Sequence, residues 1–476
     1  MEPRPSSFIL PNSPSCRVLD RFSDLPENIA VDEDGAGRIP FWPLLRHLLQ
    51  QPIDAAPQLI DRLQTIAANA EGSDGGDYGF LKEFLADDTF AAQDFFGSTW
   101  PNLRDIAVDL PVYFPTGQLD LLEPGRPLCL SRGQVACLVI HEFMCSAVPQ
   151  GHDGWYQDFG IWYASGQRHP VAVQMYLTAL FSYFASLPGA QALMSDHEAT
   201  LEDPRRCVTY TLHQQDETSL DGVALGAVHV DYLDNYNAES HLPEVQGPNG
   251  AVVVSANKVV GFGQSATQEE IFIGIAPEAC PVVLVAPHFT NETTITVCGA
   301  RAMLSVTGQK RDVSWTVRPT PPRATDFASW ARAWRGGCLV FMDALEMDMV
   351  ETADETLPDL LPANIHRELR KAQTGFSAIP GHGAVWTGLW GCGAFCGDPG
   401  VKLVVLWLAA SAAGVRLNVV LGPEEHEIGR RFELVVSVCE RSMTARGLRE
   451  LLLGVPKGLR KLEILDWLAE RVSISG

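Results

Sequence analysis

Two adjacent carboxylates follow a glycine-rich turn in the segment SANKVVGFGQSATQEEIFIGI (255–275). A β-branched run leads into Gly-Phe-Gly, and Glu269 and Glu270 open an apolar stretch with helical spacing. Glycines let a backbone approach a ligand closely, and acidic groups at a helix start are stabilised by the helix dipole. The pattern therefore offers paired carboxylates for general acid–base chemistry. It equally fits an ordinary capped helix, with Thr267 as N-cap and Glu270 at position N3.

A second glycine-rich segment, TGLWGCGAFCGDPG (387–400), stands directly before an apolar helical stretch. Five glycines surround Trp390 and Phe395, and glycine at this density before a helix can form a backbone concavity whose N–H groups bind phosphate. The segment is neither a Walker A loop nor a G-x-G-x-x-G dinucleotide fingerprint. Taken alone, it also fits an ordinary connection between two elements.

Other chemistry-bearing groups lack the partners that a site needs. His141 has no second His at zinc-protease spacing, so we expect it on a helix surface. The acidic segment 422–429 is expected to be a solvated turn. Cys392 and Cys396 lack a second ligand pair, so no metal site is predicted, and no cofactor is called for. His382 is kept as a candidate for the lining of a cleft.

Composition limits the classes of function. The chain has 476 residues, of which 46% are hydrophobic, which is enough for a large core. Its formal net charge of −23 argues against binding nucleic acid or an anionic membrane by bulk charge. An anionic ligand must therefore be bound locally, by backbone N–H groups and a few placed side chains.

The chain shows no pattern typical of secretion or membrane insertion. Its N-terminal residues lack a basic start followed by an apolar region, so no secretory signal is predicted. The longest apolar run, 403–415, is shorter than the roughly 20 residues that a bilayer span needs. The eleven cysteines are scattered and odd in number, which predicts reduced thiols in the cytosol or nucleus.

The elements that must position these groups change in type along the chain. Residues 1–35 are rich in Pro and Ser and then acidic, so we expect a poorly ordered lead-in. Helical spacing then dominates, and after about residue 206 short β-branched runs alternate with helices, which predicts an α/β sandwich with a mixed sheet. We place the domains at 36–225, helical, and 226–476, α/β. The predicted helices are 40–50, 60–70, 78–88, 133–148, 170–187, 364–376, 402–414 and 458–472, and the predicted strands are 207–214, 226–233, 251–260, 280–287 and 293–300.

Together, the two glycine-rich segments resemble the signatures of the poly(ADP-ribose) glycohydrolase family, which implies a macrodomain-like catalytic fold after a helical domain. Residues 261–270 match the family loop that ends in Gln-Glu-Glu, and 390–398 match its W-G-C-G-A-F-x-G-D motif. Similar segments continue in the same order from about residue 100 to about residue 470. They include 130–146, 177–187, 226–233, 341–347 and 366–376.

The resemblance implies hydrolysis of the ribose–ribose glycosidic bond of poly(ADP-ribose), with release of ADP-ribose. The second Glu of the motif, here Glu270, is the implied general acid and then base. Neighbouring side chains on a helix diverge by about 100°, so Glu269 and Glu270 cannot flank one bond as in the usual glycosidase pair. We therefore expect Glu269 and Gln268 to hold ribose hydroxyls or to shape the loop. Burial or the neighbouring carboxylate is expected to raise the pKa of Glu270.

The resemblance also implies a set of substrate contacts. Asn257 matches a family Asn that binds the terminal ribose, and Glu244 falls at the spacing of an adenine-contacting Glu. The backbone of the second loop is expected to wrap the diphosphate. The remaining residues implied in substrate binding are Gly261, Phe262, Gly263, Gln268, Trp390, Gly391, Cys392, Gly393, Ala394 and Phe395.

The sequence departs from the family pattern at the substrate-facing positions. The catalytic loop is shorter, with six residues between Gly261 and Gln268, which resembles divergent fungal members. Leu389 replaces a family Asn, and Gln309 stands where the family has a Tyr that closes over the site. Leu421 stands at the position of the adenine-stacking aromatic. Phe262 is a candidate to replace the missing aromatic contacts, and it fits a core position equally well.

Two functions of different class follow. The first is an active glycohydrolase acting on poly(ADP-ribose) and ADP-ribosylated proteins, with ADP-ribose as product and a role in the DNA damage response. The second is a non-catalytic macrodomain that binds ADP-ribose. Both carboxylates after Gln268 favour the enzyme, whereas Leu389 and Gln309 favour the binding module. We expect a nuclear and/or cytoplasmic monomer without direct nucleic-acid or membrane contact.

Overall fold

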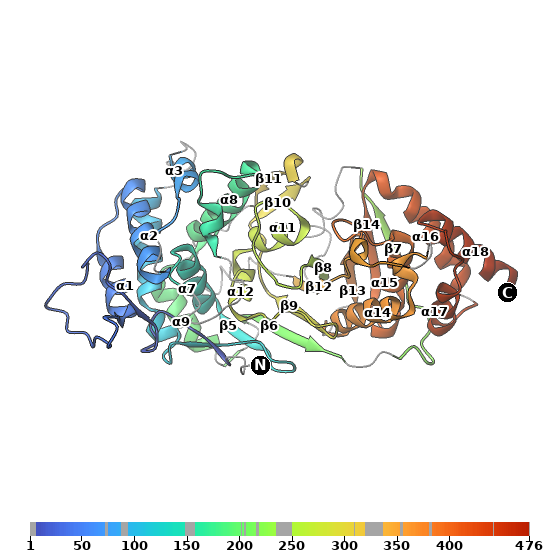
Figure 1. Ribbon diagram of the computed structural model, residues 1–476, viewed down its shortest axis with the longest axis horizontal. Helices are drawn as coiled ribbons and strands as arrows, with labels where there is room; N and C mark the ends of the chain where they lie inside the picture. The colour runs from blue at the N-terminus through green and yellow to red at the C-terminus, as the bar shows by residue number, and fades with distance from the viewer. Residues whose placement is uncertain are drawn as a thin grey trace.

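The computed structural model describes residues 6–71, 75–86, 94–147, 158–200, 202–203, 206–215, 219–234, 250–308, 310–318, 337–352, 356–379, 383–440 and 442–475. Its elements lie in three groups along one long axis (Figure 1). Helices of the N-terminal part occupy one end, a central sheet follows, and the C-terminal helices occupy the other end.

The N-terminal part is mostly helical, as predicted. In α1 the buried residues Phe41, Leu44 and Leu48 recur at the three- and four-residue spacing of one helix face. Helix α7 starts at a capping box, in which Ser131 accepts a hydrogen bond from the backbone N–H of Gln134. The helices are α1 (Phe41–Gln50), α2 (Ala56–Glu71), α3 (Gly79–Leu85), α5 (Trp100–Val108), α6 (Leu110–Tyr113), α7 (Arg132–Phe143), α8 (Pro170–Ser186) and α9 (Ala190–Thr200), with a π-helical turn η1 (Phe95–Thr99).

Residues 6–35, expected to be a poorly ordered lead-in, instead hold two short strands. β1 (Ser7–Ile9) pairs with β4 (Gln118–Asp120), and β2 (Arg17–Val18) pairs with β3 (Ile39–Pro40). Phe8, with an exposed fraction of 3%, and Leu10, with 0%, join the helical core. The Pro- and Ser-rich composition hid these few buried apolar side chains, which are enough to fix the segment.

The central sheet has eight strands in the order β5-β6-β9-β12-β8-β13-β14-β7. The first four are antiparallel neighbours, whereas β12, β8, β13, β14 and β7 run parallel, so the sheet is mixed as predicted. Two strands, β5 and β6, come from before residue 225, where the sequence placed the domain boundary. The strands are β5 (Leu128–Ser131), β6 (Cys207–Gln214), β7 (Val228–Tyr232), β8 (Ala251–Ala256), β9 (Thr293–Cys298), β12 (Cys338–Asp343), β13 (Ala384–Thr387) and β14 (Arg416–Leu421).

Helices cover both faces of the sheet. In β8, Val252 and Val254 face the core shared with the N-terminal helices, and Ala251 and Val253 face a second core built by the C-terminal helices. Burial on both faces explains why β8 reads as a continuous apolar run. The helices of the second core are α14 (Pro362–Ser377), α15 (Pro399–Ala413), α16 (His426–Cys439), α17 (Ala445–Leu453) and α18 (Leu462–Ser475).

The strand predicted over residues 280–287 is wrong. The chain there forms a single helical turn, α12 (Val282–Val285), which follows a 3-10 turn, η4 (Pro277–Ala279). Pro281 lacks the N–H that a strand ladder needs, and its fixed φ suits the start of a helical turn. A small hairpin, β10 (Leu304–Thr307) with β11 (Ser314–Val317), follows later in the chain.

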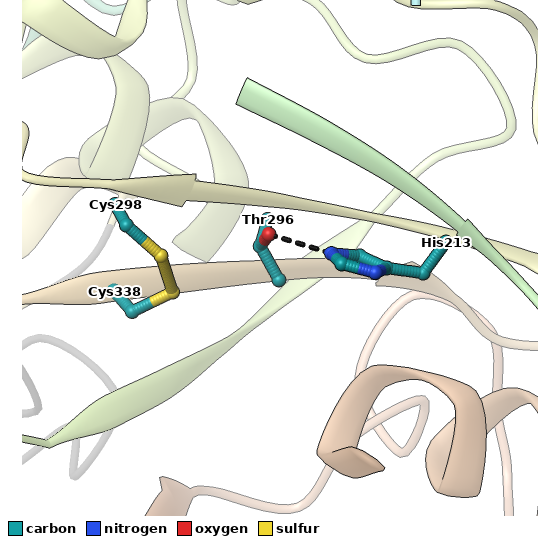
Figure 2. Close-up of a disulfide and its surroundings, with 4 residues drawn as sticks. All are labelled: His213, Thr296, Cys298 and Cys338. Carbon is teal, nitrogen blue, oxygen red and sulfur yellow. Dashed lines mark hydrogen bonds between the residues drawn. A yellow bond between two sulfur atoms is a disulfide. The ribbon is translucent and has the colours of Figure 1, made fainter. Parts of the chain in front are cut away.

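A disulfide joins Cys298 of β9 to Cys338 of β12, which corrects the expectation that all thiols are reduced (Figure 2). The two residues face each other directly in the antiparallel ladder, with their Cα atoms 4.1 Å apart. On the neighbouring strand pair, His213 Nε2 and Thr296 Oγ1 lie 2.8 Å apart in a hydrogen bond, and burial lowers the pKa of His213 to about 4. Only pairing in the folded sheet brings residues 40 positions apart into this geometry.

Within the described ranges no single helix is long and apolar enough to cross a membrane. Helices α8 and α9, bent by 85° to each other, pass the test of length and composition only when they are taken as a pair.

Candidate active site

The two glycine-rich segments follow neighbouring strands and lie at the same edge of the sheet. Strand β8 ends at Ala256, directly before the first segment, and β13 ends at Thr387, directly before the second. The two strands are parallel neighbours, so their carboxyl ends lie at the same edge. Ligands of open α/β sheets bind outside the carboxyl ends of the strands, where loops leave a crevice. Segments more than 100 residues apart in the chain thus flank one site.

The carboxylate of Glu270 holds the first loop and opens helix α11 (Gln268–Gly274). Its Oε2 accepts hydrogen bonds from the backbone N–H of Ser265, at 3.0 Å, and of Thr267, at 2.9 Å. The carboxylate also packs so closely against Gly263 that a methyl group there would overlap it. This geometry fits the capped-helix interpretation of the motif, and the capping residue Glu270 is a half-buried carboxylate at the carboxyl end of β8. Its role in acid–base chemistry stays a prediction.

Glu269 is the more deeply buried of the two carboxyls. Its exposed fraction is 6%, and its Oε2 accepts a hydrogen bond of 2.9 Å from the backbone N–H of Asn257. Burial raises the pKa of Glu269 to about 8, against the smaller lowering effect of backbone hydrogen bonds from Asn257 and Gly261. Burial thus places a raised pKa on Glu269, the direct neighbour of the residue for which the sequence-based hypothesis expected one.

The side chain of Gln268 joins the first loop to strand β8. Its Nε2 donates to the carbonyl of Val253 at 2.8 Å, and its Oε1 accepts from the backbone N–H of Ser255 at 2.5 Å. Both ends of the amide are thus bonded to β8, and only 7% of the residue is exposed. Of the two roles expected for Gln268, the contacts correspond to loop shaping.

Aromatic residues of the helical part brace the first loop. Phe262 is buried and packs against Phe159 and Trp162, with ring centroids 4.8 and 5.4 Å away. The Trp162 Nε1–H donates to the carbonyl of Gly263 at 2.7 Å, and the Tyr176 hydroxyl accepts from the backbone N–H of Ala266 at 3.1 Å. Phe262 is therefore a core residue and does not replace the missing substrate aromatics.

Trp162 and Tyr176 were not among the residues predicted for the site. Trp162 ends a 3-10 turn, η2 (Phe159–Trp162), and Tyr176 lies in α8. The dense aromatic run FGIWY at 159–163 could have indicated a packing surface, but its partner cannot be read from the sequence.

The second loop folds back on itself between β13 and α15. Gly397 N–H donates to the carbonyl of Gly391 at 2.9 Å, and Gly391 has a φ of +76°, which favours glycine. Trp390 is fully buried, and its Nε1–H donates to the carbonyl of Met342 at 3.0 Å. Trp390 therefore anchors the loop to β12 and does not face a ligand.

The tip of the second loop is open. Gly393 and Ala394 are exposed, and a methyl group added at Gly393 would meet no heavy atom within 4 Å. At the far end of the loop, the Asp398 carboxylate accepts from the N–H of Gly400 at 2.9 Å and caps helix α15. The loop is thus held firmly at both ends and leaves its middle residues facing outward.

The position of the adenine-stacking aromatic is filled by a core residue. Leu421, at the end of β14, is fully buried among the C-terminal helices. Close to it, Tyr232 at the end of β7 packs edge-on against His426, with ring centroids 5.0 Å apart. Three residues of the sequence-based hypotheses, Glu244, Gln309 and His382, lie outside the described residues.

Two segments that the sequence analysis did not include in the site, the one around His141 and 422–429, differ from expectation. His141 and Glu142, expected on a helix surface, are fully buried, because α7 is covered on all sides. His141 bonds Ser146 Oγ and the Ala107 carbonyl, and burial lowers its pKa to about 4. Segment 422–429 is a 3-10 turn, η8 (Pro423–Glu425), and the start of α16. Among the residues that the structure describes, no group of three or more His, Cys, Asp or Glu could hold a metal ion.

Comparison with known proteins places both halves of the chain in one family. Residues 233–426 match the model "Poly (ADP-ribose) glycohydrolase (PARG), Macro domain fold", and residues 88–211 match the model "Poly (ADP-ribose) glycohydrolase (PARG), helical domain". Both parts of the expected architecture, a macrodomain fold after a helical domain, are confirmed. The domain bounds predicted from the sequence stay a prediction.

Two curated relatives come from Caenorhabditis elegans. Poly(ADP-ribose) glycohydrolase 1 is 29% identical over 173 residues, which cover 33% of this chain and 21% of the relative. Poly(ADP-ribose) glycohydrolase 2 is 29% identical over 206 residues, which cover 38% of this chain and 41% of the relative. The matched regions thus span less than half of either relative.

Solved structures of bacterial poly(ADP-ribose) glycohydrolases are also similar. A mutant enzyme from Deinococcus radiodurans in complex with ADP-ribose is 18% identical, with a TM-score of 0.31 over 48% of this chain and 95% of that chain. The enzyme from Thermomonospora curvata is 12% identical, with a TM-score of 0.30 over 44% and 79%. The two family models, which match successive parts of the chain in the expected order, decide the assignment: the chain belongs to the poly(ADP-ribose) glycohydrolase family.

Proposed function

We propose that this chain hydrolyses the ribose–ribose O-glycosidic bonds of poly(ADP-ribose) and releases ADP-ribose. The observation that carries the proposal is that a carboxylate pair, Glu269 and Glu270, and the open glycine-rich loop 391–397 follow neighbouring parallel strands at one edge of the sheet. The ends of β8, β13, β14 and β7 follow one another along this edge. A ligand can therefore place a ribose at the carboxylates, a diphosphate at the loop and a base near Tyr232.

Glu270 takes the role of general acid and then base. Its carboxyl is half-buried, and two backbone N–H groups fix its orientation through Oε2. As acid it protonates the ribose oxygen that leaves when the glycosidic bond breaks. As base it takes a proton from the water that attacks the anomeric carbon, which restores the starting state.

Glu269 supports the reaction as a neutral group. With a pKa of about 8 it keeps its proton at neutral pH and can donate a hydrogen bond to a ribose hydroxyl. A protonated Glu269 also removes one negative charge from the approach of a polyanionic substrate. Catalysis by this pair should therefore decline as pH rises through about 8, when Glu269 ionises beside Glu270.

The diphosphate is bound by backbone donors near the tip of the second loop. Gly393 and Ala394 are exposed there, and among the described residues no heavy atom lies within 4 Å of where a Cβ of residue 393 would be. Main-chain binding of this kind lets a chain of net charge −23 accept an anion without a basic surface. ADP-ribosylated proteins are the proposed partners, and a nuclear and/or cytoplasmic monomer is the proposed form.

The test uses automodified polymerase as substrate and measures free ADP-ribose. The wild-type chain should release ADP-ribose, and Glu270→Gln should lower the rate by about 10²- to 10⁴-fold, the usual contribution of a general acid–base group. Binding of ADP-ribose by Glu270→Gln is the control for folding and for an intact site. If Glu270→Gln released ADP-ribose at the wild-type rate, that result would contradict the role of Glu270 as general acid and base.

A non-catalytic ADP-ribose-binding module is the second candidate. It is favoured by Leu421, which is buried where the family has a stacking aromatic, and by Gln309, which stands where the family has the closing Tyr. The same assay separates the two functions. Tight binding of ADP-ribose by the wild-type chain without any release from polymer would identify a binding module.

A further inference from the structure

A buried ammonium group lies inside the second glycine-rich loop. Lys402, in the first turns of α15, has an exposed fraction of 0%. A methyl group at Gly391 would lie 3.2 Å from its Nζ, and one at Gly397 would lie 2.6 Å from its Cε. The Nζ also lies 4.9 Å from the ring centroid of Trp390. The loop that is proposed to bind the diphosphate is therefore folded around a cation.

Lys402 is held by a buried network of charges. Its Nζ forms an ion pair with Glu368, whose other oxygen accepts from Arg367 at 2.5 Å and from the backbone N–H of Leu345 at 3.1 Å. Glu368 has an exposed fraction of 2% and Arg367 one of 5%. The ion pair with Glu368 fixes Lys402 relative to the residues that follow β12. One network of charges therefore holds both the second glycine-rich loop and the end of β12.

The network continues under the first loop. Asp343, at the end of β12, pairs with Arg367 at 2.5 Å and with Lys371 at 2.6 Å. Lys371 Nζ also donates to the carbonyls of Thr290 and Thr293, at 2.5 and 2.6 Å. The three cations thus face two anions, Asp343 and Glu368, in the interior.

Two further carboxylates lie close to Lys402. Asp398 is engaged by the N–H groups of Gly400 and Lys461. Asp359 Oδ1 accepts from the N–H of Asp398 at 3.1 Å, and burial raises the pKa of Asp359 to about 6. Of the charged side chains in this network, Lys402 is the one whose Nζ lies against Gly391 of the second glycine-rich loop.

We propose that Lys402 is a positioning residue for the diphosphate, and that its buried charge, held by Glu368, attracts the anion through the loop without touching it. The inference rests on the proposed function, because it takes loop 391–397 as the diphosphate site. A buried charge is screened by salt far less than a surface charge. In a chain of net charge −23, one such cation under the loop supplies local attraction that the surface lacks.

A cycle of four proteins separates this electrostatic role from a merely structural one. The proteins are the wild type, Lys402→Met, Glu368→Gln and the double variant, and calorimetry measures the Kd of each for ADP-ribose. Removing a unit charge about 8 Å from a phosphate should weaken binding on the order of tenfold at an effective dielectric of about 20. Lys402→Met should therefore bind ADP-ribose more weakly than wild type. Glu368→Gln removes the negative charge that partly cancels the Lys402 charge, so it should bind at least as tightly as wild type. The double variant should lie between the two.

A structural brace predicts a different order. If the ion pair only holds the loop, Glu368→Gln and the double variant should lose affinity like Lys402→Met, and that order would overturn the proposal. The tenfold ratio between wild type and Lys402→Met should also persist at high salt. Lys82→Met, on the exposed face of α3, removes the same charge at a distance and should leave the Kd unchanged.

Two other results of these measurements would also decide the question. If Lys402→Met does not fold, Glu368→Gln decides alone, since weaker binding by that variant contradicts the proposal. If the wild-type chain binds no ADP-ribose, the proposed function itself fails. The Lys402 inference fails by itself only when wild-type binding is intact and the order of the four affinities is wrong.

Discussion

Replacement of Glu269 by Gln should stabilise the protein, and the gain should grow with pH. The folded-state pKa is about 8, whereas the ordinary value for a Glu is 4.5. Between these values the folded chain binds more protons than the unfolded chain, so stability falls as pH rises from about 4.5 to about 8. Glu269→Gln removes this loss, because an amide does not ionise and keeps an oxygen that accepts from the Asn257 N–H.

The size of the effect follows from the same two pKa values. Relative to the wild type, the variant should gain almost nothing near pH 4, about 3 kcal/mol at pH 7 and about 5 kcal/mol at pH 9, where the gain levels off. Any constant effect of the new amide shifts all three values together. The pH dependence of the difference is therefore the signature of the buried carboxyl.

Urea denaturation at the three pH values measures the difference in unfolding free energy. Glu27→Gln, at an exposed position, is the control for loss of a carboxylate in general. A difference between Glu269→Gln and wild type that stays flat from pH 4 to pH 9 would refute the assignment of a raised pKa. The variant should also hydrolyse polymer more slowly, since residues that destabilise a fold often serve its activity.

Four further predictions concern the two loops and their support. Gly263→Ala should reduce hydrolysis at least 100-fold by displacing the Glu270 carboxylate, while ADP-ribose binding at the second loop falls less, as rate and Kd measurements will show. Gly393→Ala should weaken ADP-ribose binding about tenfold or more with an unchanged melting temperature, because its methyl group meets only the ligand. Gly391→Ala, with φ +76° and a close contact to Ala344, should lower the melting temperature itself. Trp162→Phe loses the hydrogen bond to the Gly263 carbonyl in the first loop and should lower the free energy of unfolding by about 1 kcal/mol. It should also lower kcat. An unchanged kcat would show that this hydrogen bond is not needed for activity.

Local patterns in the sequence predicted what local physics decides. The capping box of Thr267 and Glu270 depends on residues three apart, and the reach of Glu270 back to the Thr267 N–H is present. The continuous apolar run of β8 and the helical face of α1 likewise need only neighbours along the chain. For the same reason the order of helices and strands was mostly correct.

The misses at the site and in the cysteine pairing depend on distant packing. Whether Glu269 or Glu270 is the more deeply buried depends on how α11 lies against β8, which the spacing of the two residues does not contain. Trp162 reaches Gly263 from more than 100 positions away, and nothing in its own neighbourhood names that partner. The pairing of Cys298 with Cys338 required knowing which strands are neighbours, because the sequence offers eleven cysteines and no framework.

The strand order also determines when the protein can fold as the ribosome makes it. Strand β8 is flanked by β12 and β13, which are both synthesised later, and edge strand β7 pairs with β14, whose residues emerge almost 200 positions afterwards. The antiparallel set β5, β6 and β9 can assemble once residue 298 has emerged, but the parallel half waits for Leu421. Until then strand β7 lacks its neighbour β14, and the apolar strand β8 lacks neighbours until β12 and then β13 have emerged. Strands without neighbours are the condition in which unpaired edges aggregate. The nascent chain therefore has its greatest need for chaperones between the completion of β8 and the arrival of β14.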